Sequence, residues 1–115
     1  ASTQVVVRLA GMAEATQLAE RLRAQPLTEL GGVPVARLQD LLSPGAAAVP
    51  ANVLCYTLSD GTRVMIRPSG TEPKLKVYID TFSDQGTLDE RRNSAIEALG
   101  TVETALREYL DQAAA

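Results

Sequence analysis

Residues 52–81, NVLCYTLSDGTRVMIRPSGTEPKLKVYIDT, decide the fold. Apolar and β-branched residues dominate two runs, 52–58 and 62–67, which Ser59-Asp60-Gly61 joins. An Asp-Gly pair between two such runs is a strong hairpin signal, because glycine adopts the positive φ of a tight turn without strain. From residue 74 to residue 81 apolar and polar side chains alternate, which is typical of a strand with one buried face. The segment therefore predicts three consecutive strands, and their short connections favour antiparallel pairing.

Two further strand patterns lie before this segment. β-branched residues over 3–9 predict a strand, or alternatively the tail of an interdomain connector. Residues 33–38 predict another strand after the turn Gly31-Gly32, and Pro34 limits it to a sheet edge or a strand start. Residues 43–50 predict a loop, because Pro-Gly is a turn signal.

Two amphipathic helices complete the pattern. Apolar residues at helical spacing predict one helix over residues 13–23, and the capping box Thr87-Leu88-Asp89-Glu90 begins the other. Because both helices need a common apolar surface, we predict an α+β two-layer sandwich: a mainly antiparallel sheet of about four strands with two helices on one face. The expected apolar stripe of the second helix is Leu88, Ile96, Leu99, Val102, Leu106, Tyr109 and Leu110.

Length and composition narrow the classes of function. The 115 residues fit a single domain, residues 1–115, and 45% of them are hydrophobic, which is typical of a globular protein. The single cysteine, Cys55, excludes an internal disulfide and is expected to be a small core residue. The absence of histidine excludes a Ser-His-Asp triad and the usual zinc sites. The net charge of −3 argues against nucleic-acid and membrane partners, and a free cysteine without an export signal predicts a cytoplasmic protein.

One loop concentrates positive charge in an otherwise acidic chain. Residues 63–76 contain four of the 11 basic residues and one of the 14 acidic ones, so they carry +3 while the rest of the chain carries −6. Two prolines bracket Ser69-Gly70-Thr71-Glu72, whose four amides and two hydroxyls are the donors inside the loop. Gly70 lets the backbone approach a ligand closely, and Arg67 ends the preceding strand. A guanidinium, hydroxyls and successive amides together suit a phosphate ester.

The same residues allow a purely structural alternative. In it, Ser69 and Thr71 satisfy their own backbone, and Arg67 pairs with Glu72. Lys74 and Lys76 are expected to point away from the helix-covered face. They either extend the anion site as supporting residues, together with Glu72, or are the solvated charges of an edge strand.

Residues 67–78, RPSGTEPKLKVY, closely resemble the phosphate-binding loop in the C-terminal domain of the phosphohexomutases, the phosphoglucomutase, phosphomannomutase and phosphoglucosamine mutase superfamily. The resemblance implies a TATA-box-binding-protein-like α+β fold, and it implies that Arg67, Ser69, Gly70 and Thr71 contact the substrate phosphate. It also implies that this domain holds the phosphate of a hexose phosphate or hexose bisphosphate that is not being transferred. Three other domains of the parent enzyme would supply a phosphoserine, a magnesium loop and a sugar-recognition loop.

The catalytic parts of such an enzyme have no counterpart in this sequence. It contains no Asp-Gly-Asp-x-Asp loop, no serine in a phosphoserine context and no Gly-Glu-x-Ser-Gly loop. We therefore predict no catalytic residue, no metal site and no cofactor in this chain, with Mg²⁺ belonging to the full-length enzyme, and no mutase activity from the chain alone. Two alternatives stay open: a stand-alone phospholigand-binding module, and a nucleic-acid module, against which the four aromatic residues and the negative charge argue.

Overall fold

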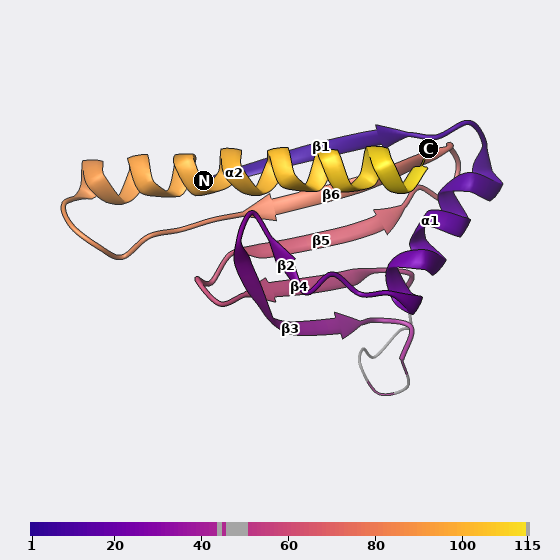
Figure 1. Ribbon diagram of the computed structural model, residues 1–115, viewed down its shortest axis with the longest axis horizontal. Coiled ribbons are helices and arrows are strands. Elements are labelled where there is room, and N and C mark those ends of the chain that lie inside the picture. Colours follow the sequence, from indigo (N-terminus) through magenta and orange to yellow (C-terminus); the bar gives the residue numbers. More distant parts are fainter. Residues whose placement is uncertain (44, 46–50, 115) are drawn as a thin grey trace.

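The computed structural model describes residues 1–43, 45 and 51–114, and Figure 1 shows their arrangement. These residues form strands and helices in one α+β unit, so the predicted fold class is confirmed. The elements in chain order are β1 (Ser2–Arg8), α1 (Met12–Ala24), β2 (Glu29–Leu30), β3 (Val33–Asp40), β4 (Leu54–Leu58), β5 (Arg63–Pro68), β6 (Lys74–Asp80) and α2 (Leu88–Ala114). The loop predicted over residues 43–50 lies for the most part outside the described residues.

One antiparallel sheet contains six strands of the described chain, in the order β1-β6-β5-β4-β3-β2. The predicted count of about four strands is therefore too low. One reason is that the stretch considered as a connector tail forms β1 and pairs with β6 from Ser2 opposite Asp80 to Arg8 opposite Lys74. The other reason is the turn Gly31-Gly32, whose φ values of 60° and 81° favour glycine and fold the short β2 back onto β3.

The hairpin between β4 and β5 forms as predicted. Gly61 has a φ of 89°, its N–H donates to the Leu58 carbonyl at 3.0 Å, and the Thr62 N–H donates to Asp60 Oδ1 at 2.9 Å. After β5, residues 69–73 return the chain to β6, which lies between β5 and β1. The loop singled out in the sequence therefore joins two interior strands of the sheet.

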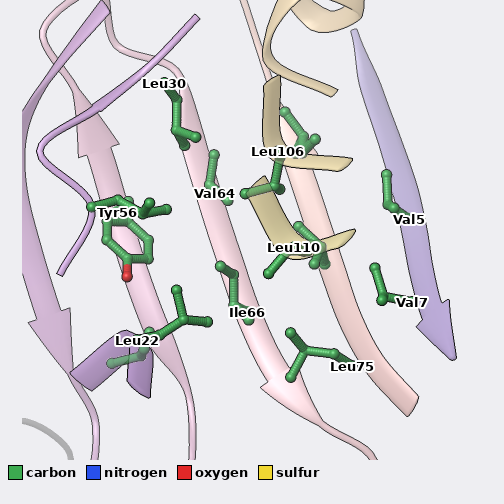
Figure 2. Packing of buried hydrophobic residues seen from close by; sticks show 14 of the residues in the cluster. Val5, Val7, Leu22, Leu30, Tyr56, Val64, Ile66, Leu75, Leu106 and Leu110 are labelled. Atoms are coloured by element: carbon green, nitrogen blue, oxygen red, sulfur yellow. The ribbon is translucent and has the colours of Figure 1, made fainter. Parts of the chain in front are cut away.

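Both helices cover the same face of the sheet, as predicted (Figure 1). Figure 2 shows the buried side chains that the helices and strands contribute to the core between them. Burying a large apolar side chain stabilises the fold by roughly 1.5–3 kcal/mol, so this core fixes β5 and β6 on both sides of the loop. The core includes Leu18, Leu22, Val102, Leu106 and Leu110 from the helices, and Val5, Leu54, Tyr56, Val64, Ile66, Leu75, Val77 and Ile79 from the strands.

The long helix α2 begins where the capping box predicts. Thr87 Oγ1 accepts a hydrogen bond from the Glu90 N–H at 3.2 Å, and the Glu90 carboxylate lies 3.2 Å from the same hydroxyl. The first turns of α2 extend beyond the end of the sheet (Figure 1). Leu88 is consequently 69% exposed. Ile96 is 53% exposed for another reason: Ala95 beside it is buried and accepts a hydrogen bond from Thr81 Oγ1, so this turn packs against the fold while Ile96 lies at the side of the buried stripe. The predicted place of both residues in the stripe is wrong.

Neither helix covers the second face of the sheet. Val6, Met65 and Tyr78 lie there with more than a third of their surface exposed. Cys55, opposite Met65, is half-buried on this open face, so its predicted place in the core is wrong. Within the described residues, no helix has the length and apolar character that crossing a membrane requires.

Candidate functional site

The loop at residues 69–73 lies at one corner of the sheet, where β5 and β1 end and β6 begins (Figure 1). The strand register sets Arg67 opposite Lys76 and Arg8 opposite Lys74. The Leu9 N–H donates to the Pro73 carbonyl at 2.8 Å, which ties the end of β1 to the loop. The fold thus assembles four cationic side chains around the loop.

Hydrogen bonds from the loop's own atoms fix its shape. The Ser69 N–H donates to the Lys74 carbonyl at 2.9 Å, and the Lys74 N–H donates to the Glu72 carbonyl at 2.8 Å. Ser69, a residue that is 8% exposed, accepts hydrogen bonds at its Oγ from the N–H groups of Thr71 and Glu72 at 3.4 and 3.3 Å. These two bonds are longer than usual and therefore weak.

The donors left for a ligand are fewer than the sequence predicted. Of the four loop amides, those of Thr71 and Glu72 have an acceptor inside the loop and that of Ser69 has one at the start of β6, so Gly70 alone has an N–H without an acceptor among the described residues. The two weak bonds to Ser69 Oγ are the ones that an anion with stronger acceptor oxygens can replace.

Nothing in this chain requires glycine at position 70. Its φ is not positive, and a Cβ built there would meet no atom within 4 Å. The space beside Gly70 is therefore open to a ligand. Thr71 is exposed next to it, and its hydroxyl has no hydrogen-bond partner within the part of the chain described.

Arg67 does not form the predicted structural pair with Glu72. Glu72 Oε2 instead lies 2.8 Å from Lys74 Nζ, while the exposed Arg67 forms no ion pair with a described carboxylate. That half of the structural alternative is wrong, although Ser69 does satisfy its own backbone, as the same alternative expected. The hydrogen bond from Lys74 lowers the pKa of Glu72, and the charges of Lys74, Arg8 and Lys76 lower it further.

Lys74 and Lys76 are not the solvated charges of an edge strand, because β6 has β1 on one side and β5 on the other. Both lysines are half-buried on the open face, as the alternation predicts, and only 16% of the Lys74 side chain is exposed. The two lysines and Arg67 therefore lie beside one another at the loop.

Arg8 is the one member of this corner that the sequence analysis missed. More than 50 residues separate it from the loop, and only the pairing of β1 with β6 brings the two together. The alternation of buried Val5 and Val7 places Arg8 on the open face, but a strand pattern does not reveal its neighbouring strand.

The described part of the chain contains no cluster of three or more aspartate, glutamate, cysteine or histidine side chains that could hold a metal ion. That Mg²⁺ is bound elsewhere in a full-length enzyme stays a prediction.

Comparison with known proteins identifies the family. A family model described as "Phosphoglucomutase/phosphomannomutase, C-terminal domain" matches residues 7–98. A protein of Haemophilus influenzae described as "Probable phosphomannomutase" is 37% identical over 79 residues. The aligned segment spans 69% of this chain and 16% of that relative, so the chain corresponds to a small part of the relative's length. On the extent of these matches, together with the observed fold, the chain belongs to the phosphoglucomutase/phosphomannomutase C-terminal domain family.

Proposed function

We propose that this domain binds the phosphate of a hexose phosphate or hexose bisphosphate, as the phosphate-holding domain of a phosphoglucomutase or phosphomannomutase. The observation that carries the proposal is the position of Arg67. Its guanidinium has no carboxylate partner among the described residues, and it lies beside Lys76 and a loop with a free amide at Gly70. Family membership supports the same assignment.

The proposed contacts divide between the strand and the loop. Arg67 offers a planar fork of donors that fits two phosphate oxygens, and Lys76 adds a point charge opposite it. Gly70 offers its N–H and open space, and the Thr71 hydroxyl is free to donate. Ser69 Oγ holds two amides through weak bonds, so these amides and the Ser69 hydroxyl are available once a phosphate oxygen replaces those bonds.

Every donor named here suits an oxyanion, so we expect such a site to recognise the phosphate and to depend little on which sugar carries it. It would therefore hold a phosphate on either end of a hexose. Binding energy gained at a phosphate that does not react can orient the groups that do react. The domain would serve this positioning role for chemistry performed by other domains, and the chain alone is expected to show no mutase activity with Mg²⁺.

The test is a titration of the 115-residue chain with glucose 6-phosphate and with mannose 1-phosphate, followed by NMR, with glucose as the unphosphorylated control. We expect both phosphates to bind with Kd on the order of 1 mM, because one domain supplies only part of a binding cleft, and we expect glucose not to bind. Arg67→Gln should abolish measurable binding, whereas Arg37→Gln, on β3 of the same face, should not. Equal affinity of the two variants, or equal binding of glucose, would contradict the proposal.

A further inference from the structure

Two pairs of like charges face each other across neighbouring strands at the corner. Arg67 on β5 lies opposite Lys76 on β6, and Lys74 on β6 lies opposite Arg8 on β1. Residues directly opposite in an antiparallel pair have Cβ atoms about 4.5–5.5 Å apart, and like charges at such positions destabilise a sheet. The fold therefore tolerates an arrangement that does not favour its own stability.

Among the described residues, Glu72 is the one carboxylate that forms an ion pair with any of these four cations. Glu72 Oε2 lies 2.8 Å from Lys74 Nζ, and the charges of Arg8 and Lys76 also act on that carboxylate. The Glu72 side chain is 54% exposed, so it can turn toward solvent, whereas the Lys74 side chain is only 16% exposed and is held in place. Among the described residues, neither Arg8 nor Arg67 forms an ion pair of its own.

We propose that Arg8 is a ligand-binding residue of the phosphate site, supplied by β1, and that Glu72 is the site's internal anion, which competes with the ligand for the same cations. The inference rests on the proposed function and adds two residues with opposite effects on affinity. In the free protein Glu72 neutralises part of the corner formed by Arg8, Lys74 and Lys76. When a phosphate binds, its dianion replaces Glu72 as the counter-ion of these cations, and the Glu72 carboxylate turns toward solvent.

The connection of β1 to the loop supports this role, because it fixes where the Arg8 backbone lies relative to the loop. The Leu9 N–H to Pro73 carbonyl bond of 2.8 Å fixes the residue after Arg8 against the end of the loop. Strand pairing then fixes the Arg8 backbone against Lys74. The Arg8 backbone is thus fixed at the same corner of the sheet as Arg67, although Arg8 lies outside the loop sequence.

The test compares four variants in the 115-residue chain, each titrated with inorganic phosphate and with glucose 6-phosphate at low ionic strength. Arg8→Gln should raise Kd about three- to tenfold, and Glu72→Gln should lower it by a similar factor. Each variant changes the charge of the site by one unit, and that charge acts on a bound dianion several ångströms away. Arg37→Gln is the matched control for net charge and should change Kd less than twofold. Arg67→Gln should abolish binding.

A second readout separates ligand binding from a structural role. In urea without ligand, Arg8→Gln should be as stable as the wild type or more stable, because it removes a like-charge pair. Loss of stability together with loss of binding would overturn the inference, since it would make Arg8 a structural residue. A Kd of Arg8→Gln equal to that of Arg37→Gln would overturn the inference while leaving the proposed function standing. Weaker phosphate binding by Glu72→Gln than by the wild type would do the same. Failure of the wild type to bind either phosphate would overturn both.

Discussion

The buried hydroxyl of Tyr56 makes stability in alkaline solution a direct test of the packing between α1 and the sheet. Tyr56 is 1% exposed, and Figure 2 shows its ring in the core near Leu22. Its hydroxyl makes no hydrogen bond among the described residues, although the nearby Leu27 backbone offsets part of the effect of burial on its pKa. Burial raises the pKa of Tyr56 from 10.0 to about 12.

The direction of the pH effect follows from this rise. A pKa that is higher in the folded state means that the neutral phenol favours folding, so this contribution is intact below pH 10 and is lost as the pH rises toward 12. A difference of two pKa units corresponds to about 2.7 kcal/mol at full titration. Halfway through the window, at pH 11, the loss is about 1.4 kcal/mol.

The assay compares Tyr56→Phe with the wild type by urea unfolding at pH 8, 10, 11 and 12. At pH 8 the variant should match or exceed the wild type by up to about 1 kcal/mol, because it removes an unpaired buried hydroxyl. Its advantage should grow by about 1.4 kcal/mol at pH 11, since phenylalanine does not titrate. Tyr78→Phe, on the open face, is the control at pH 8 for removing a phenol hydroxyl that is not in the core. A Tyr56→Phe advantage that stays constant from pH 8 to pH 12 would refute the reasoning.

Three further predictions concern the core, a helix terminus and ligand binding. Leu106→Ala removes a fully buried side chain of α2 and should lower the free energy of unfolding in urea by about 2–5 kcal/mol. Ile96→Ala, at a 53% exposed position of the same helix, should lower it by less than about 0.5 kcal/mol. Thr87→Ala should cost about 1 kcal/mol in the same assay, because it removes the acceptor of the Glu90 N–H, and an unchanged stability would mean that this cap does not form in solution. Affinity for glucose 6-phosphate should rise between pH 5 and pH 7, because the phosphate gains its second negative charge near pH 6. The chain has no histidine, so no histidine charge changes over the same range. An affinity independent of pH would show that the site does not prefer the dianion.

Local signals in the sequence predicted the elements that local physics determines. Asp60-Gly61 predicted its hairpin because the turn conformation itself favours glycine, and Thr87 predicted the start of α2 because a cap is made within one turn. Leu88 and Ile96 do not lie in the buried stripe that the helical pattern predicted. Periodicity indicates neither where the packed length of a helix begins, which decides the exposure of Leu88, nor how wide its buried stripe is, which decides that of Ile96.

The same distinction between local signals and long-range contacts applies to the candidate site. Arg67, Ser69, Gly70 and Thr71 are consecutive or nearly so, and their residue types alone suggested an anion site. The bonds from two loop amides to Ser69 Oγ depend on the loop's conformation, which residue types do not specify. Arg8 escaped notice because strand pairing between distant segments is a property of the whole fold.

The Gly70 amide resonance tests the central claim most directly, because Gly70 has the one loop amide without an acceptor among the described residues. The measurement is its ¹⁵N–¹H shift during addition of glucose 6-phosphate, with equal concentrations of glucose and of sodium chloride as controls. The account predicts a saturable shift of Gly70, with smaller shifts of Thr71 and Glu72 as their bonds to Ser69 are replaced. An unmoved Gly70 resonance at saturating ligand, or an equal shift with sodium chloride, would contradict it.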